Sequence, residues 1–341
     1  MRETTDVIII GGGPAGAAAG IAALGSGLRV SLFEAAGTPR EKPGETLHPG
    51  IAPILDRLGI LAGAEAAAGW RPDGQWTAWN APPELSRYGV DECGAWRAFQ
   101  LNRAMLDTLL LERFVALGGD LVRPAPALVP MVTAGRVAGV VADRRVVRAP
   151  LTIDASGKRG LLRRALGLTV RAISRPLIAH YGYRRGFFDA HPMLVGDGDG
   201  WTWIAQVEPG KIAWVSLLLQ GGKEPRRLPD ALAAMPECGR PGATDVTWRM
   251  ADRLAGPGWF LAGEAACTLD PAASQGVLRA LMSGMMAAHH AAQVRTGATH
   301  AVEAERSYSA WLQSWFQHDA ARLLTLYRTH AKNFPATLFY A

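Results

Sequence analysis

Residues 6–34 constrain the fold of this chain more than any other stretch. Four β-branched residues at 7–10 predict a strand that is buried on both faces of a parallel sheet. The turn at 11–16 reads G-x-G-x-x-G, which permits a tight turn, a close approach of backbone amides to a pyrophosphate, and packing of a helix against the strand. A second strand over 29–33 ends in Glu34, an acid placed to accept hydrogen bonds from a ribose with a free 2′-hydroxyl. We therefore predict an α/β fold that binds a dinucleotide.

The composition is that of a soluble globular protein. Of the 341 residues, 49% are hydrophobic and 19% are charged, and the length suggests about two domains. Residues 7–28 carry no charge and are long enough to span a bilayer, but seven glycines and the change from a strand to a helix pattern argue against a membrane span. The net charge of +6 is spread without a block of like charge, so no nucleic-acid partner is expected.

The cysteines indicate a reducing compartment. Cys93, Cys238 and Cys267 are odd in number, widely separated and without the spacing of a metal site, so we predict reduced thiols and no metal. Charged residues at 2–6 directly precede the first strand, which leaves no pattern of a signal peptide. The expected location is the cytoplasm.

A polar loop over 38–50 follows the second strand and contains three prolines and two glycines. It leads into a predicted helix over 51–58 and is a candidate wall of an active site. Its titratable members, His48 and Glu45, are the candidate catalytic residues. The alternative for His48 is a loop histidine bonded to the backbone, and Glu45 is expected to be structural or a cofactor contact rather than a proton carrier.

Tryptophan-rich segments predict a second domain. Residues 65–99 contain four tryptophans among prolines and glycines, which is typical of a core or a pocket wall. Two strands at 201–207 and 212–217 flank a type II turn candidate and form the clearest antiparallel pair. Period-two spacing places Trp201 and Trp203 on one face, which contacts either the core or a bound cofactor and substrate.

Two segments between these regions return to the predicted dinucleotide site. Asn102 is expected to cap a helix over 103–117, whose first residue, Arg103, lies at the unfavourable end of the helix dipole and needs an anionic partner such as a pyrophosphate. The segment 128–153 predicts a β-meander whose last strand, 146–153, leads into Asp154-Ala155-Ser156-Gly157.

The C-terminal part adds one more strand and two helices. A buried strand at 259–262 precedes Gly263-Glu264 and, after a short loop, a long helix predicted from Gly276 to about residue 294. The N-terminus of that helix would be aimed at the cofactor, where it favours negative charge. A further amphipathic helix is predicted over 303–330.

Four stretches fall in one order: the glycine turn at 11–16, Arg103 at a helix start, residues 154–157, and the run 263–276 with its Asp270-Pro271. This order resembles the FAD-dependent oxidoreductases of the p-hydroxybenzoate hydroxylase and flavin-dependent halogenase superfamily. The resemblance implies a Rossmann-like FAD-binding domain of the glutathione reductase type, with an inserted antiparallel-sheet substrate domain and C-terminal helices. It implies FAD as the cofactor. Because only one dinucleotide fingerprint is present, NAD(P)H would bind transiently as electron donor, or a partner flavin reductase would serve.

The resemblance also implies residue roles. Glu34 would hold the adenosine ribose, and Arg103 the phosphates or the ribityl chain. Gly263 and Glu264 would contact the ribityl chain, although the superfamily normally has an aspartate at the position of Glu264. Trp201 and Trp203 would line the substrate pocket. The full set of expected FAD-binding residues is Gly11, Gly13, Pro14, Ala15, Gly16, Glu34, Ala35, Gly44, Glu45, Arg103, Asp154, Ala155, Gly157, Gly263, Glu264, Gly276 and Val277.

Within the superfamily, the loop at 43–47 and the run 200–204 look most like the halogenase branch. The W-x-W-x-I-P signature stops at 204–205, however, and no lysine lies between Lys42 and Lys158 to serve as the hypohalous-acid lysine of that branch. Halogenation is therefore disfavoured. The short chain and the sequence Gly-Glu-Thr-Leu-His-Pro at 44–49 also resemble the flavoproteins that mature cysteine tryptophylquinone oxidases by oxidising a protein tryptophan.

The expected activity is that of an FAD-dependent monooxygenase or closely related oxidoreductase that acts with O₂ on an electron-rich, aromatic substrate. The alternatives are a maturation factor that hydroxylates tryptophan of a partner protein and a flavin-dependent C=C reductase of the geranylgeranyl reductase type. The expected domains are an FAD-binding domain of 1–65, 100–170 and 255–300, a substrate domain of 66–99 and 171–254, and a C-terminal helical segment of 301–341.

Overall fold

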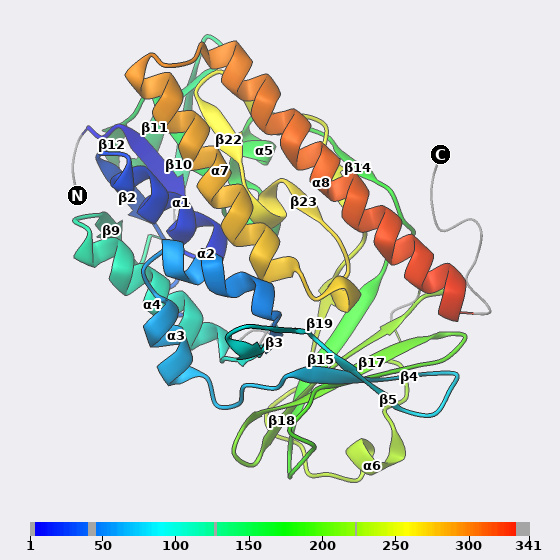
Figure 1. Cartoon of the computed structure of the whole chain (residues 1–341). Coiled ribbons are helices and arrows are strands. Elements are labelled where there is room, and N and C mark those ends of the chain that lie inside the picture. The colour runs from blue at the N-terminus through cyan, green and yellow to red at the C-terminus, as the bar shows by residue number, and fades with distance from the viewer. Residues whose placement is uncertain (1–3, 40–45, 126–127, 222–223, 332–341) are drawn as a thin grey trace.

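The fold is built on a six-stranded, mostly parallel sheet. The computed structural model describes residues 4–39, 46–125, 128–221 and 224–331 (Figure 1). All four residues of the first strand are almost fully buried, as their unbroken β-branched run requires in a sheet covered on both faces. In sheet order the strands are β21 (Ala255–Gly256), β22 (Trp259–Leu261), β13 (Leu151–Asp154), β1 (Val7–Ile10), β2 (Val30–Phe33) and β9 (Asp120–Val122). The predicted α/β class is confirmed.

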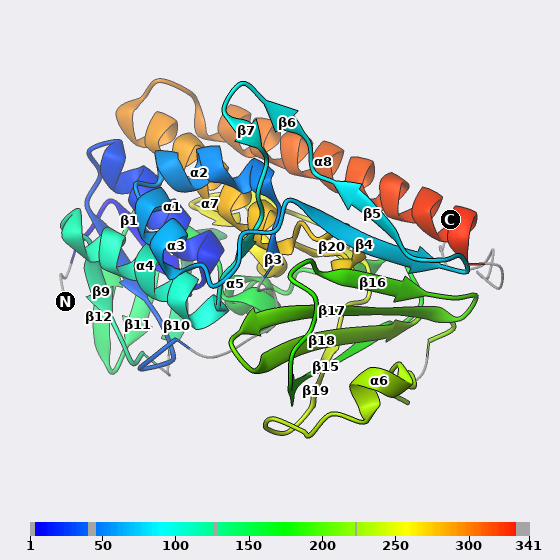
Figure 2. The ribbon, with the colours of Figure 1, turned by 60° about the horizontal axis from the view of Figure 1, so that its bottom comes forward.

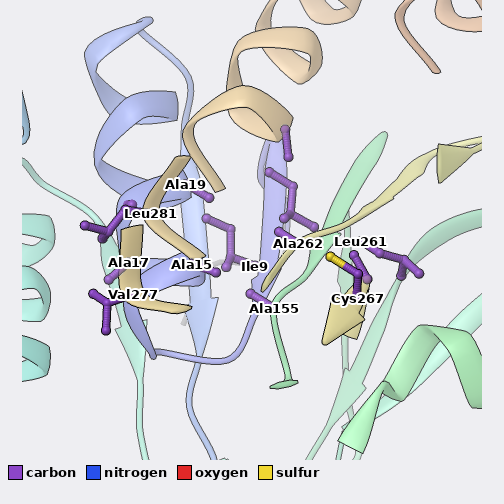
Figure 3. Packing of buried hydrophobic residues seen from close by; sticks show 14 of the residues in the cluster. Ile9, Ala15, Ala17, Ala19, Ala155, Leu261, Ala262, Cys267, Val277 and Leu281 are labelled. Atoms are coloured by element: carbon purple, nitrogen blue, oxygen red, sulfur yellow. The ribbon is translucent and has the colours of Figure 1, made fainter. Parts of the chain in front are cut away.

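Two helices cross closely on one face of this sheet. Helix α1 (Pro14–Gly25) is rich in alanine and glycine, and α7 (Gly276–Thr296) lies against it. A Cβ at Gly284 would lie 2.0 Å from the carbonyl oxygen of Ala15, so only glycine permits this crossing. Figure 3 shows Ala15 and Ala17 of α1 beside Val277 and Leu281 of α7. The crossing brings the N-termini of both helices to the same edge of the sheet.

A three-stranded antiparallel sheet of β10 (Leu128–Thr133), β11 (Arg136–Ala142) and β12 (Arg145–Arg148) covers part of the opposite face (Figure 2). The predicted meander is present, but its last strand is not continuous over 146–153. Pro150 lacks an N–H and follows the end of β12, so antiparallel pairing stops there. The chain then continues as β13, which leaves the meander and pairs in parallel with β1.

The second sheet has seven strands and carries the predicted hairpin of 201–207 and 212–217. Gly210 in the connecting turn has φ +74°, as a type II turn requires at its third residue. The strand at 74–79, from the tryptophan-rich segment, joins this sheet in parallel with β16. In sheet order the strands are β19 (Gly242–Asp245), β15 (Ile178–Arg185), β18 (Lys211–Leu218), β17 (Gly200–Glu208), β16 (Met193–Gly196), β4 (Gly74–Trp79) and β5 (Glu84–Arg87).

Helices connect and cover the two sheets. The longest, α8 (Ala301–His330), runs along α7 and ends beside the seven-stranded sheet (Figures 1 and 2). Within the described ranges, no helix is both long and apolar enough to cross a bilayer. The other elements are α2 (Ala52–Arg57), α3 (Leu61–Ala67), α4 (Arg103–Ala116), α5 (Leu161–Ala165), α6 (Asp230–Ala233), β3 (Thr46–Leu47), β6 (Val90–Asp91), β7 (Gly94–Ala95), β8 (Phe99–Gln100), β14 (Val170–Ala172), β20 (Arg249–Ala251) and β23 (Cys267–Thr268), with short 3₁₀ turns η1 (Pro49–Ile51), η2 (Gly157–Arg159), η3 (Gly263–Ala265) and η4 (Pro271–Ala273).

Asp6 ties the first two strands to the end of α7. Its Oδ2 accepts from the backbone N and Nε of Arg29 at 3.0 and 3.1 Å, and its Oδ1 accepts from Nε of Arg295 at 3.1 Å. The hydrogen bonds from Arg29 lower the pKa of this carboxyl from 3.8 to about 2. The ionised side chain therefore stabilises the folded state wherever the unfolded carboxyl would also be ionised.

We expect Asp6→Asn to lower the free energy of unfolding by about 2 kcal/mol at pH 7. The folded pKa is below the unfolded one, so this difference is complete above the unfolded pKa and disappears as the pH falls through the folded pKa of about 2. Urea unfolding at several pH values measures it. Asp230→Asn is the control, because Asp230 and its partner Arg227 have side chains 85% and 86% exposed, and a pair of that kind contributes little. An equal loss in both variants would contradict the prediction.

Candidate functional site

A cavity of about 930 Å³ lies between the parallel sheet and the seven-stranded sheet. Its walls include the loops that follow the carboxyl ends of β1, β2, β13 and β22, the first turns of α1, α4 and α7, and one face of the seven-stranded sheet. Ligands of open α/β folds bind at this edge, because the strand ends and the helix N-termini meet there. The fold therefore creates one site with two parts, a glycine-rich part and a sheet part.

The glycines of the turn at 11–16 differ in the physical reason for which glycine occupies each position. Gly11 has φ +102°, and a Cβ there would lie 2.4 Å from the carbonyl oxygen of Ala155. A Cβ at Gly16 would lie 1.8 Å from the carbonyl oxygen of Gly11, so this position serves packing and does not line the cavity. Gly13 has an ordinary φ of −73°, and its Cβ would meet no described atom within 4 Å. The protein alone does not require glycine at 13, and the open space beside it is part of the cavity.

Two helix N-termini face the cavity without side-chain caps. In the described part of the chain, neither Gly13 before α1 nor Gln275 before α7 makes a side-chain cap hydrogen bond, and neither first turn contains an acid. Their free backbone N–H groups and the positive ends of the helix dipoles suit phosphate or carbonyl oxygens of a ligand. Gly276, like Gly13, has open space where a Cβ would be.

The carboxylate of Glu34 is fixed by backbone amides. Its Oε2 accepts from the N–H of Gly12 at 2.6 Å and its Oε1 from the N–H of Ala36 at 2.7 Å. Glu34 and the neighbouring Ala35 both line the cavity. Each carboxylate oxygen keeps a further lone pair, so Glu34 is oriented and still able to accept from a ligand hydroxyl.

Arg103 is the first residue of α4, as predicted, and the side chain of Asn102 caps that helix by accepting from the N–H of Ala104 at 2.8 Å. The anionic partner that Arg103 needs is present within the protein. Its Nη2 lies 3.3 Å from Oδ1 of Asp107, with the two side chains 12% and 6% exposed. Both residues line the cavity, so the ion pair holds a cationic group in the wall.

Asp154 lies behind the cavity wall and not in it. The side chain is fully buried, and its oxygens accept from the N–H groups of Ser156 at 2.9 Å and Leu162 at 2.8 Å. Burial raises the pKa of this carboxyl, and the hydrogen bonds oppose that shift. Asp154 therefore shapes the loop that brings Ala155 and Gly157 to the cavity. Asp154, predicted to be a cofactor-binding residue, does not itself line the cavity, so its proposed part in cofactor binding is to hold this loop in place.

Apart from Gly16, the other predicted cofactor residues that the structure describes line the cavity. Two further predicted residues, Gly44 and Glu45, are outside the described residues. The members that line the cavity are Gly11, Gly13, Pro14, Ala15, Glu34, Ala35, Arg103, Ala155, Gly157, Gly263, Glu264, Gly276 and Val277.

His48 is bonded to the backbone and also borders the cavity. Its Nδ1 accepts from the N–H of Gly50 at 3.1 Å, so it caps η1 as a backbone-bonded loop histidine, and it also lines the cavity. Its ring contacts Tyr88 edge-on at 5.2 Å between centroids. Burial and the positive charge of Arg322 lower the pKa of His48, which favours the neutral imidazole.

Lys158 is a cavity residue that the sequence analysis did not select. Its Nζ donates to the carbonyl oxygen of Asp245 at 2.7 Å and to Oγ1 of Thr244, and it lies 4.0 Å from Oε1 of Glu264. Burial lowers the pKa of this amine, and the charge of Glu264 opposes the shift. The available signal was its position directly after Asp154-Ala155-Ser156-Gly157. Its partners come from β19, which no local pattern connects to it.

The sheet part of the cavity is mainly apolar and aromatic. Tyr181 of β15 and Trp203 of β17 are half-buried and line it. Trp201 also lines it, but this side chain is only 1% exposed and its Nε1 donates to the hydroxyl of Tyr327 at 3.0 Å. Trp201 is thus at once a core residue and a cavity wall. Leu194, Val215 and Val246 complete this part of the surface.

The fold and the cavity define an architecture of the dinucleotide-binding flavoprotein type, with a second, separate sheet on the other side of the cavity. Residues 4–217 match the FAD binding domain family, to which this chain therefore belongs, within the FAD-dependent oxidoreductases. The tryptophan 2-halogenase of Chondromyces crocatus is 26% identical over 97% of this chain and 69% of its own length. The 6-methylpretetramide 4-monooxygenase of Streptomyces rimosus is 34% identical over 48% of this chain, which is 41% of that enzyme. The flavin-dependent brominase Bmp2 has the same fold, with a TM-score of 0.83 at 21% identity over 95% of this chain and 87% of that one.

The residues of the cavity fit FAD on three observations. Gly13 and Gly276 leave space that side chains would fill. Two uncapped helix N-termini face the same cavity. Oγ1 of Thr268, a lining residue that is 3% exposed, has no hydrogen-bond partner among the described residues, so a ligand group can satisfy it.

Proposed function

We propose that this protein is an FAD-dependent monooxygenase that oxidises an electron-rich, aromatic small molecule. One observation carries the proposal: the cavity runs without interruption from the glycine turn at 11–16 to the aromatic face of Tyr181 and Trp203. A cofactor on the glycine side would therefore share one cavity with a substrate on the sheet side. An apolar, aromatic lining selects a flat, apolar substrate.

The residues proposed to hold FAD divide by chemistry. The amides at the start of α1 would bind the pyrophosphate, and Glu34 would accept from the adenosine ribose. Arg103, fixed by Asp107, would bind a phosphate or a ribityl hydroxyl. Gly263 and Glu264 would lie along the ribityl chain, and the N-terminus of α7 would face the ring system. When bound, FAD supplies the electron transfer and the activation of oxygen.

The chain's own contribution is positioning, exclusion of water and electrostatics. Trp203, Tyr181 and their aliphatic neighbours would hold the substrate and keep bulk water from it. The positive end of α7 would stabilise negative charge that develops beside it. Because Nδ1 of neutral His48 accepts from the backbone, the ring proton lies on Nε2, which can donate a hydrogen bond into the cavity.

The test is the visible spectrum of the purified protein, followed by anaerobic addition of NADH or NADPH and then of air. We expect bound FAD, bleaching of its visible absorption by one nucleotide, and incorporation of one oxygen atom into an aromatic substrate such as a phenol or an indole. Bromide in the same assay is expected to give no brominated product, because no lysine lies between Lys42 and Lys158 to serve as the halogenase lysine. Absence of flavin after reconstitution would contradict the proposal at its base.

Other outcomes would identify the alternative activities. Turnover of an alkene without consumption of oxygen would identify a C=C reductase. FAD that neither nucleotide reduces, with oxidation only of a tryptophan in a partner polypeptide, would identify a maturation factor served by a separate reductase. Brominated or chlorinated product would place the chain with the halogenases that it resembles.

A further inference from the structure

The C-terminal end of α8 is bonded to the cavity wall through a buried chain of side chains. Nε1 of Trp201 donates to the hydroxyl of Tyr327 at 3.0 Å, and that hydroxyl donates to Oδ1 of Asp270 at 2.8 Å. Nε1 of Trp248 donates to Oδ2 of the same carboxylate at 2.7 Å. All four side chains are at most 2% exposed. Four segments that are distant in the sequence are thereby joined: the turn before α7, the last turns of α8 and the residue before β20 meet at this carboxylate, and β17 is bonded to it through the hydroxyl of Tyr327.

Asp270 is the acceptor at which this series of side-chain hydrogen bonds ends. Besides the two side-chain donors, its Oδ1 accepts from the N–H of Ala272 at 2.9 Å and so fixes the turn η4 that leads to α7. Burial raises the pKa of the carboxyl, and the three hydrogen bonds oppose that shift. A buried carboxylate with three fixed donors has one favourable arrangement, because any reorientation leaves a donor or an oxygen unsatisfied.

The same helix end also contacts the edge of the seven-stranded sheet. The side-chain amide of Asn80 donates to the carbonyl oxygen of His330 at 2.8 Å, and the ring of Trp79 lies 5.5 Å from that of His330. Figures 1 and 2 both show the end of α8 beside this sheet, although its start lies over the parallel-sheet body. The helix thus connects the body that would hold FAD to the sheet that would hold the substrate.

We infer that Tyr327 and Asp270 are positioning residues that fix the indole of Trp201 in the sheet-side wall of the cavity. Trp201 and Asp270 line the cavity, whereas Tyr327 lies behind them and acts through the indole. This inference rests on the proposed function. It assigns the last turns of α8 to the shape of the substrate pocket, a role beyond covering the core.

The experiment compares two tyrosines of the same helix. Tyr327→Phe removes the hydroxyl that holds Trp201, and Tyr308→Phe is the matched control. Tyr308 is also fully buried, and its hydroxyl donates to the carbonyl oxygen of Leu261 at 2.5 Å, in the parallel-sheet body. Both changes delete one buried hydroxyl, so they share a structural cost, but only one removes a contact of Trp201.

The readouts are ¹⁹F NMR of the FAD-loaded protein with 5-fluorotryptophan, the signal of Trp201 being assigned with Trp201→Phe, and the Kd of indole. We expect Tyr327→Phe to shift or broaden the Trp201 signal and to raise the Kd of indole about 5- to 10-fold, with FAD retained. Tyr308→Phe should leave both unchanged. An unchanged Trp201 signal in Tyr327→Phe, or equal changes in both variants, would overturn the inference.

The NMR comparison does not depend on the substrate. If indole fails to bind the unmodified protein, the proposed aromatic substrate is wrong, whereas the Trp201 signal still decides whether Tyr327 positions the indole. If indole binds and its Kd is the same in all three proteins while the Trp201 signal moves, the residue is held by Tyr327 but does not shape the pocket, and the positioning role is refuted.

Discussion

Replacement of Gly13 by aspartate is expected to leave the protein folded and to weaken FAD binding about 100-fold or more. Gly13 is the N-cap of α1, has φ −73°, and has open space at its Cβ position. Aspartate is among the best N-cap residues, so its carboxylate would accept from the free amides of the first turn and satisfy the helix. The same carboxylate would occupy the space and the donors of a pyrophosphate and would repel its charge.

The measurement is the Kd of FAD by fluorescence quenching, together with the free energy of unfolding of the apoprotein. Gly13→Ala, which adds bulk without charge, should weaken binding about tenfold. Gly25→Ala is the control, since Gly25 lies at the other end of α1 and also has open space at its Cβ position. Tight FAD binding by Gly13→Asp would show that the pyrophosphate does not lie at this turn.

Trp201→Ala is expected to lower the free energy of unfolding by about 3–5 kcal/mol, the cost of deleting a large buried side chain. The indole is 1% exposed and donates to Tyr327, so the substitution leaves a cavity in the core and removes a hydrogen bond. Trp203→Ala, two residues along the same strand face, should cost about 1–2 kcal/mol, because that side chain is half-buried. The two tryptophans lie on one strand face, but the expected loss in free energy of unfolding is larger for Trp201 than for Trp203.

Chemical denaturation of both FAD-loaded variants measures this difference. Trp203→Ala should keep FAD and lose most of the substrate oxidation, which places its effect at the pocket. Equal destabilisation by the two substitutions would show that Trp203 is as much a core residue as Trp201, and would remove the main support for an aromatic substrate wall.

Local patterns in the sequence determined the dinucleotide-binding unit. The strand at 7–10, the glycine turn, the helix from Pro14 and Glu34 at the end of the next strand were all predicted, because each depends on neighbours within a few residues. The capping of α4 by Asn102 and the hairpin around Gly210 were predictable for the same reason. Side-chain caps, turn conformations and hydrophobic periodicity are short-range properties.

Contacts between distant segments were decided only by the tertiary structure. Pro150 divides the predicted last strand of the meander, and β13 finds its partner in β1, more than a hundred residues earlier in the chain. The side chain of Asp154 points into the loop after it, and the amine of Lys158 finds its partners on β19.

The cavity wall is the plainest case. The sequence by itself determined that Trp201 is on a strand face and that a helix ends near residue 330, and both predictions are confirmed. The sequence did not predict that this strand and this helix end are bonded to each other. The hydrogen bonds from Trp201 to Tyr327 and from Tyr327 to Asp270 connect segments up to 126 residues apart. Such pairing depends on how the sheets and helices pack, since a buried polar group is satisfied by whichever donor the packing brings to it and not by its neighbours in sequence.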